Sequence, residues 1–295
     1  MKATTNIYDQ ITNEIIKQME SGIIPWQKPW HDNGTFIFMG CISHTSGKPY
    51  SLLNQWLLGG KAGEWLTFKQ IQAEGGRVKK GEKARTVVFY KYIDRVEEQE
   101  DGNGNLVEVV TGSFPILKGY SVFHIDQTEG IAPRYANEPN EYDNEANESA
   151  ERVVAEYVQR EELKLFVEQS DRAYYRPSTD EVHVPLMKQY DVVEEYYSTL
   201  FHELTHSTGH AKRLNRKGIA GVAHFGDENY SKEELVAEIG AAFLCKAVGI
   251  DSDKAFNNSV AYLQGWLNVL RKDKKLIVTA AARAEAAAKY ILNKG

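Results

Sequence analysis

The residues with the clearest chemical potential are His202, Glu203 and His206, which stand in the order His-Glu-Leu-Thr-His. On a helix, positions four apart lie on one face, so the two imidazoles can bind a single metal ion. Glu203 would lie beside them, where a carboxylate can act as a general base toward water instead of binding the metal. The motif is short and not specific by itself, but it predicts a metallopeptidase site that hydrolyses amide bonds.

A third protein ligand is expected, because a catalytic zinc ion usually takes three and leaves one position for water. The segment SKEELVAEIGAAFL (231–244) has helical spacing that places Glu234 and Glu238 on one face. Either carboxylate could bind the metal, and the other could accept the free N–H of a ligand histidine. The alternative is that Glu233 and Glu234 are solvated residues at a helix start, where acids are favoured. A third histidine in the metzincin spacing is excluded, because Lys212 stands at that position.

Two histidines and a glutamate most often bind Zn²⁺, and they also accept Mn²⁺ or Co²⁺. A closed structural zinc site would more often use four ligands, mostly cysteines. The chain has only two cysteines, Cys41 and Cys245, far apart in sequence, which also argues against a disulfide framework. The sequence therefore predicts one divalent metal, most often zinc, in an open catalytic site.

The elements that must position these residues form a mainly helical second half. Helical periodicity and turn residues predict its order along the chain. The expected helices are 150–162, 192–208, 231–248, 252–273 and 278–292, with short strands at 163–169 and 181–187.

The first half mixes helical and strand patterns. Apolar residues at helical spacing predict a helix at 6–22, and Thr67 is a plausible N-cap for a short helix within 65–73. TVVFYKYI (86–93) is typical of a strand, because it is rich in β-branched and aromatic residues. The turn DGNGN (101–105) predicts a hairpin partner at 106–110, and a further strand is expected at 119–125.

The chain's 295 residues suit two domains. The segment 136–151 is acidic and polar, contains no basic residue, and is interpreted as a linker; the alternative is a solvated helix face. We therefore predict an α+β protein with an N-terminal α+β domain at 1–135 and a mainly helical domain at 152–295.

Positive charge is concentrated in one short segment, although the chain has a net charge of −6. Residues 77–91 contain six basic side chains against one acid, Glu82. The basic residues are Arg77, Lys79, Lys80, Lys83, Arg85 and Lys91, and nearby aromatic residues include Trp65 and Tyr90. Cations that follow phosphates and rings that stack on bases favour single-stranded DNA. The alternative is a solvated turn with aromatic side chains in the core.

The N-terminal sequence has no apolar signal segment, and no run approaches the ~20 apolar residues that span a bilayer. We therefore expect a cytoplasmic protein without a membrane partner.

Long segments of both halves resemble an ArdC-type antirestriction protein, and the similarity runs over nearly the whole chain. In the first half they are PWQKPW (25–30), SGKPYSLLN (46–54), EWLTFKQIQAEGGRVKKGEKARTVVFYK (64–91) and YSVFHIDQTEG (120–130). In the second half they are AYYRPSTDEVHVP (173–185), YYSTLFHELTHSTGHAKRLNR (196–216), SKEELVAEIGAAFLC (231–245) and AYLQGWLNVLRKDKKLI (261–277).

The resemblance implies an N-terminal domain that binds single-stranded DNA and a C-terminal zincin-like metallopeptidase domain of the Glu-binding type. By analogy with that type, Glu234 would be the metal ligand and Glu238 would orient His202. It also implies a protein of a conjugative plasmid or related mobile element that protects incoming DNA from host restriction. Two other functions stay open: a regulatory or self-processing metalloprotease without a DNA role, and a metal-stabilised DNA-binding module whose protease site is inactive.

Overall fold

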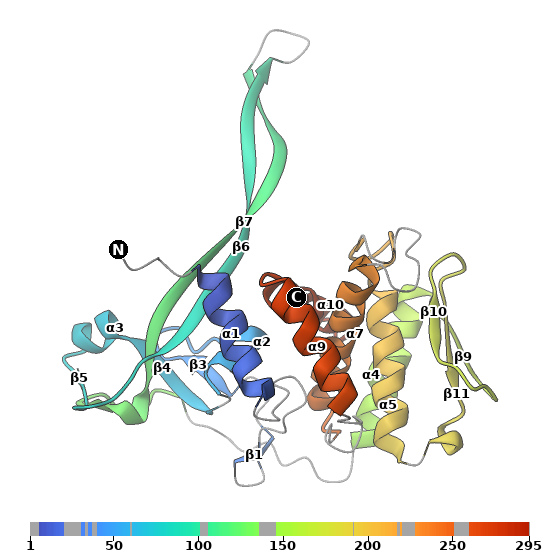
Figure 1. Cartoon of the computed structure of the whole chain (residues 1–295), viewed down its shortest axis with the longest axis horizontal. Helices are drawn as coiled ribbons and strands as arrows, with labels where there is room; N and C mark the ends of the chain where they lie inside the picture. Colours follow the sequence, from blue (N-terminus) through green and yellow to red (C-terminus); the bar gives the residue numbers. More distant parts are fainter. Residues whose placement is uncertain are drawn as a thin grey trace.

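The computed structural model describes residues 6–20, 31–32, 35–36, 40–59, 61–100, 106–135, 146–190, 192–216, 219, 228–250 and 260–294. The predicted α+β class is confirmed, with a sheet-rich N-terminal part and a mainly helical C-terminal part (Figure 1). Among the residues that the structure describes, no helix is both long and apolar enough to cross a membrane.

The N-terminal part is built on a four-stranded sheet in the order β3-β4-β7-β6. Its strands are β3 (Cys41–Ser43), β4 (Gly63–Thr67), β6 (Arg85–Glu100) and β7 (Leu106–His124). Within this sheet β3 and β4 pair in parallel, and the other two pairs are antiparallel. Smaller elements surround it: β1 (His31–Asp32), β2 (Thr35–Phe36), α2 (Leu52–Leu57), α3 (Phe68–Ala73), β5 (Arg77–Val78) and β8 (Thr128–Glu129). Thr67 caps α3, as predicted, and forms a capping box with Gln70.

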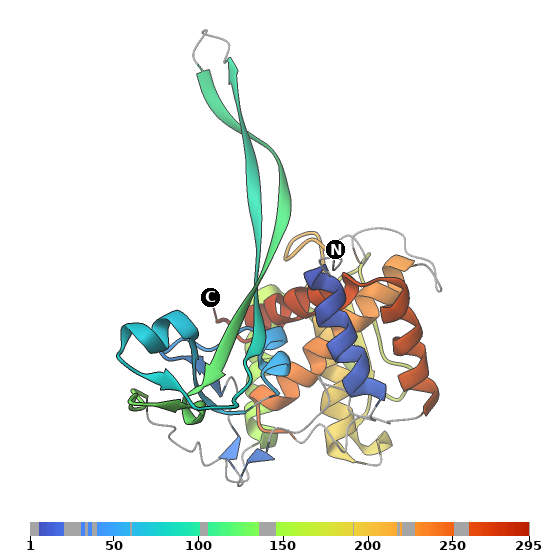
Figure 2. The same cartoon turned by 60° about the vertical axis from the view of Figure 1, so that its left-hand side comes forward.

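Strands β6 and β7 continue far beyond the sheet as a two-stranded arm (Figures 1 and 2). The two strands expected at 106–110 and 119–125 are therefore one strand, and the predicted break between them is wrong. Gly112 and Pro115 interrupt the sequence pattern. In a two-stranded arm each strand has one unpaired edge, where a proline need not remove a ladder hydrogen bond. The predicted turn 101–105 lies outside the described residues.

The described residues of the C-terminal part form long helices and a three-stranded sheet in the order β10-β11-β9. The helices are α4 (Ala146–Glu161), α5 (Val193–Ser207), α7 (Glu228–Ala247), α9 (Val260–Lys272) and α10 (Leu276–Ile291). The strands are β9 (Lys164–Glu168), β10 (Tyr174–Arg176) and β11 (Glu181–Pro185). Helix α5 packs between this sheet and helix α7, so it has partners on two sides.

The two parts share an apolar core. Helix α1 (Ile7–Glu20), which matches the helix predicted at 6–22, turns Ile11, Ile15 and Met19 into the cluster that contains Leu235 of α7 and Leu270 of α9. The division into residues 1–135, 136–151 and 152–295 stays a prediction. Residues 136–145 lie outside the described part of the chain, and α4 already begins at Ala146.

Candidate functional site

Three side chains from helices α5 and α7 meet in one cluster. The Nε2 atoms of His202 and His206 lie 3.1 Å apart. Oε1 of Glu234 lies 3.4 Å from Nε2 of His206, and Oε2 lies 3.5 Å from Nε2 of His202. Within the described part of the chain, this is the group of His, Cys, Asp and Glu side chains whose ligand atoms are close enough to hold a metal ion.

The geometry of these atoms fits a tetrahedral cation. Bonds of about 2.0–2.1 Å to Zn²⁺ place two tetrahedral ligand atoms roughly 3.3–3.4 Å apart. The observed separations of 3.1, 3.4 and 3.5 Å bracket that value. The carboxylates of Glu233 and Glu234 raise the pKa of His206 to about 10, against burial, which alone would lower it. The cluster therefore favours positive charge at its centre.

Helices α5 and α7 reach this geometry because they pack very closely. A Cβ atom at Gly240 of α7 would lie 2.6 Å from Cγ2 of Thr205 on α5, so any other residue would force the helices apart. Glycine inside a helix costs roughly 1 kcal/mol relative to alanine, and here it permits the close contact. The buried side chains Phe201 and Leu204 hold the other side of α5 in the core. The helix pair is thus fixed where Glu234 can face both histidines.

The structure also places the other two predicted site residues. Glu203 follows His202 on α5 and is buried, and its predicted role as general base stays untested. Glu238 lies one turn after Glu234 on α7, but the cluster with metal-ligand spacing in the described residues does not include it. The predicted role of Glu238 in orienting His202 stays untested.

Glu233 is the residue that the sequence argument missed, because it named this acid only in the alternative, as a solvated residue at a helix start. Its carboxylate is only 3% exposed and lies 3.6 Å from Nδ1 of His206. Arg216, itself buried, donates from Nε to both carboxylate oxygens, at 3.1 and 3.0 Å. Burial would raise the pKa of Glu233, but His206 and Arg216 hold it below its usual range. Glu233 therefore remains ionised behind the imidazole of His206.

Arg216 connects this carboxylate to the end of helix α5. Its Nη2 donates to the carbonyl of Thr205 at 2.8 Å, and its Nη1 donates to Oγ1 of Thr208 at 2.6 Å. Carbonyls in the last turn of a helix lack intrahelical donors, so a cation there is favourable. Arg216 thus holds the Glu233 carboxylate beside His206, at a charge contact of 3.6 Å that is longer than a hydrogen bond, and also holds the turn that carries the ring.

Replacing Glu233 by Gln is expected to lower the affinity for Mn²⁺ or Zn²⁺ about 10- to 100-fold, the usual effect of losing a group that orients a ligand histidine. Isothermal titration calorimetry on the full chain measures this affinity. Circular dichroism without metal separates it from a loss of folding, since Arg216 also loses a partner. An unchanged affinity in a folded Glu233→Gln variant would contradict the role.

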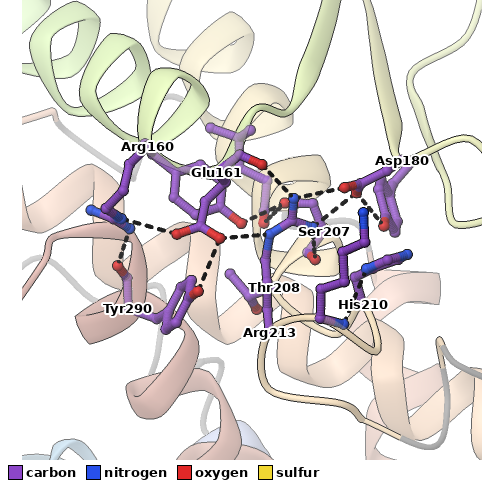
Figure 3. A network of polar contacts seen from close by, with 12 residues as sticks. Arg160, Glu161, Asp180, Ser207, Thr208, His210, Arg213 and Tyr290 are labelled. Carbon is purple, nitrogen blue, oxygen red and sulfur yellow. Dashed lines mark hydrogen bonds and ion pairs between the residues drawn. The ribbon is translucent and has the colours of Figure 1, made fainter.

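A second arginine, Arg213, also binds the end of α5. Figure 3 shows Arg213 between Glu161, Asp180 and the carbonyl of Ser207. Its two Nη atoms each lie 2.8 Å from an oxygen of Asp180, and Nη1 also donates to Ser207 at 2.9 Å. Nε donates to Glu161 at 3.1 Å, and Glu161 accepts the hydroxyl of Tyr290 at 2.9 Å. Arg213 therefore joins α4, the turn before β11, α5 and α10.

The basic segment is exposed between β5 and the start of β6. Its predicted DNA-binding residues Lys80, Lys83 and Arg85 are exposed to solvent. Arg77 is also exposed but pairs with Glu129 at 2.6 Å, and Lys79 donates to the carbonyl of Asp126 at 2.7 Å. Arg77 and Lys79 therefore also hold the loop in place.

The two aromatic residues predicted to stack on DNA, Trp65 and Tyr90, are not exposed as the basic loop is. Trp65 is 2% exposed, packs with Cys41, and donates from its indole to the carbonyl of Lys61, so its face is closed to a base. Tyr90 is half-buried and packs against the core shared with helices α7, α9 and α10. The burial of Trp65 contradicts its expected role, because the sequence shows an aromatic residue near basic ones but not the direction of its ring.

Comparison with known proteins covers both parts of the chain. The model of the N-terminal domain of the anti-restriction factor ArdC matches residues 5–123, and a zincin-like metallopeptidase model matches residues 150–283. The chain is 36% identical to a DNA primase TraC of Escherichia coli over 97% of its own length and 27% of the primase. It therefore spans little more than a quarter of that relative. The protein y4eC of Sinorhizobium fredii is 33% identical, over 97% of this chain and 92% of that protein.

Two solved structures of the antirestriction protein ArdC from plasmid R388 share the fold along the whole length. The metal-free structure is 32% identical with a TM-score of 0.66, covering 98% of this chain and 97% of that one. The Mn(II)-bound structure is 32% identical with a TM-score of 0.69, covering 98% of both chains. These matches cover both parts in the same order, and the chain therefore belongs to the ArdC-type antirestriction family, with a zincin-like metallopeptidase domain in its C-terminal half.

Proposed function

We propose that this chain is an antirestriction protein that binds single-stranded DNA through its N-terminal part and a divalent cation through His202, His206 and Glu234. The observation that carries the proposal is the cluster of these three side chains at 3.1–3.5 Å, with Glu203 buried on the same helix. Membership of the ArdC-type family supports the biological role, and the Mn(II)-bound relative supports a divalent cation. Zinc is the ion that this ligand set most often holds.

The chain's own residues suggest amide hydrolysis. Glu203 would take a proton from the attacking water and transfer it to the leaving amine. The bound cation would polarise the scissile carbonyl and lower the pKa of water. The carboxylate of Glu233, behind the cluster, would keep the ring of His206 oriented. The substrate would be a protein, since an amide bond is what such a site cleaves.

The DNA-binding part of the proposal rests on the exposed loop between β5 and β6. Lys80, Lys83 and Arg85 are exposed in a chain whose net charge is −6, so this positive charge is local. Local positive charge attracts phosphates even when the whole protein is acidic.

The test compares restriction of incoming DNA in cells that carry the wild type, Glu203→Gln, or Lys80→Ala combined with Lys83→Ala. Metal content and affinity for single-stranded DNA are measured for each purified protein. Loss of protection in Glu203→Gln with intact DNA binding would assign the role to hydrolysis. Loss only in the double lysine variant would assign it to DNA binding. A wild-type chain that neither protects nor binds single-stranded DNA would refute the proposal.

A further inference from the structure

The inner half of the β6–β7 arm carries an exposed aromatic and basic surface that the predicted sites do not include. We call it the ribbon stripe, and its members are Phe89, Lys91, Phe114, Lys118 and Tyr120. The three rings are 51%, 45% and 47% exposed, respectively, and both lysines are exposed. Soluble proteins rarely expose several large apolar side chains on one face, so a set of three exposed rings marks an interaction surface.

Strand pairing places the members of the ribbon stripe on one face of the arm. Alternate residues of a strand share a face, and residues directly opposite on the paired strand share it too. The partners are Val87 with Tyr120, Phe89 with Lys118, Lys91 with Ile116, and Ile93 with Phe114. The odd-numbered residues of β6 and the even-numbered residues of β7 thus line the same side.

The opposite face of the arm is already occupied near its base. Val88 is buried in the core shared by the two parts, and Tyr90 and Leu117 pack against that core. At Gly119 an added Cβ would lie 2.8 Å from the side chain of Ile7 on α1, so helix α1 covers this side. The rings of the ribbon stripe point the other way and are about half exposed, whereas Val87 on the same face, at the base of the arm, is buried with Cys41 and Trp65.

The charge on the inner half of the arm is entirely positive. Residues 85–93 and 114–123 contain Arg85, Lys91 and Lys118 and no acid. Acids begin further out, where Asp94, Glu97 and Glu98 are exposed with Arg95. This charge pattern attracts a polyanion to the inner half of the arm and repels it from the outer half. The ribbon stripe is therefore limited to the inner half.

The spacing of the rings suits a strand whose bases are not stacked on each other. Consecutive residues of a strand advance about 3.3 Å, so Tyr120 and Phe89 lie roughly 7 Å apart along the arm, and Phe114 lies roughly 13 Å further. Stacked bases in a duplex advance about 3.4 Å and hide their faces. The rings can therefore take the faces of separate, unpaired bases.

A cleft of about 460 Å³ opens beside Phe89, between the base of the arm and helix α10. Tyr50 and Lys289 also line it, and its volume is within the range of small-ligand sites. Glu285, the acid among its lining residues, forms an ion pair with Lys289 at 2.9 Å and accepts a hydrogen bond from the backbone N–H of Leu52 at 3.0 Å. Val88 and Tyr90, on the opposite face of the arm, also line the cleft, so it opens at the edge of β6, beside the ribbon stripe and not on it.

We propose that the ribbon stripe is the base-stacking surface for single-stranded DNA, and that it continues from the basic loop along β6. The inference rests on the proposed DNA-binding function. It assigns the stacking role to Phe89, Tyr120 and Phe114, in place of Trp65 and Tyr90. Lys91, Lys118 and Arg85 contact the phosphates on the same face.

The experiment measures binding of a fluorescein-labelled oligothymidylate to the full chain by fluorescence anisotropy. Phe89→Ala and Tyr120→Ala are each expected to weaken binding about 5- to 150-fold, the effect of losing one base–ring contact. Lys118→Ala is expected to reduce the slope of log affinity against log salt by about 0.7. Phe166→Ala is the matched control, because this ring is 40% exposed on β9 in the C-terminal part. Its affinity should equal that of the wild type.

A Phe89→Trp variant gives a direct signal, since an indole that stacks on thymine loses fluorescence when the oligonucleotide binds. If the wild type binds and Phe89→Ala and Tyr120→Ala bind as tightly as Phe166→Ala, the ribbon stripe is not the stacking surface, while DNA binding itself stands. An indole signal in Phe89→Trp that stays unquenched at saturating oligonucleotide, relative to the wild type, would lead to the same conclusion. If the wild type does not bind, the proposed function fails, and the inference fails with it.

Discussion

Glu234→Gln is expected to lose Mn²⁺ or Zn²⁺ affinity by more than the roughly 10- to 100-fold that removal of an outer partner costs. Both oxygens of Glu234 face the histidine pair, at 3.4 and 3.5 Å from the two Nε2 atoms. An amide keeps the shape of the side chain but removes the negative charge and replaces one oxygen ligand by a nitrogen that carries hydrogens. Glu238→Gln should cause a smaller loss, because Glu238 lies one turn further along α7.

Calorimetric titration of the metal-free full chain measures all three affinities, for the wild type and the two variants. Glu156→Gln on α4 is the control, because this side chain is exposed and distant in sequence from the cluster. A larger loss in Glu238→Gln than in Glu234→Gln would exchange the roles of the two carboxylates.

The histidine pair could be predicted from the sequence because its spacing alone determines its geometry. Two residues four apart on one helix are neighbours wherever that helix lies. The proposed third ligand is different, since Glu233, Glu234 and Glu238 stand on another helix. Which of them faces the histidines depends on how α5 and α7 cross, and the close contact at Gly240 sets that crossing. A pattern within one segment contains no information about this contact.

The proposed DNA-binding surface shows that a strand pattern is limited in the same way. The basic residues and nearby rings are visible in the sequence, but burial separates rings that composition treats alike. Trp65 is 2% exposed and Phe89 is 51% exposed. The pairing of Phe89 with Lys118 joins residues 29 positions apart (118 − 89), and it decides which side chains share a face. The ribbon stripe therefore becomes visible only when the register of β6 and β7 is known.

The prediction of two domains also describes the architecture only in part. The family models divide the chain into an N-terminal and a C-terminal region, as the composition predicts. However, Ile15 of α1 and Leu270 of α9 belong to one buried cluster. Amphipathic helices at the two ends of the chain each show an apolar face, but neither pattern identifies its partner. The fold places these helices together in the core that the two parts share.

Arg213→Met is expected to lower the free energy of unfolding by about 3–5 kcal/mol, the usual result of removing one partner from a buried ion pair. The side chain of Arg213 is 1% exposed, and methionine fills a similar volume without donors. Asp180, Glu161 and the carbonyl of Ser207 would then lose their shared partner. At about 2–4 °C per kcal/mol for a protein of this size, the melting temperature should fall by roughly 6–20 °C. Differential scanning calorimetry measures it.

The pH dependence of this loss distinguishes an ion pair from simple packing. Burial raises the pKa of Asp180, but Arg213 and Tyr175 outweigh it and hold that pKa below its usual value. A depressed folded-state pKa contributes stability above the unfolded value of about 3.9, and this contribution is lost as pH falls through the folded value. The difference in unfolding free energy between the wild type and Arg213→Met should therefore be largest at pH 6 and become smaller below about pH 4. Arg172→Met, at a side chain that is 80% exposed, should change stability by less than about 0.5 kcal/mol at either pH. A gap that does not change with pH would mean that Arg213 supports helix α5 through its contacts with Ser207 and its packing, and not through its charge.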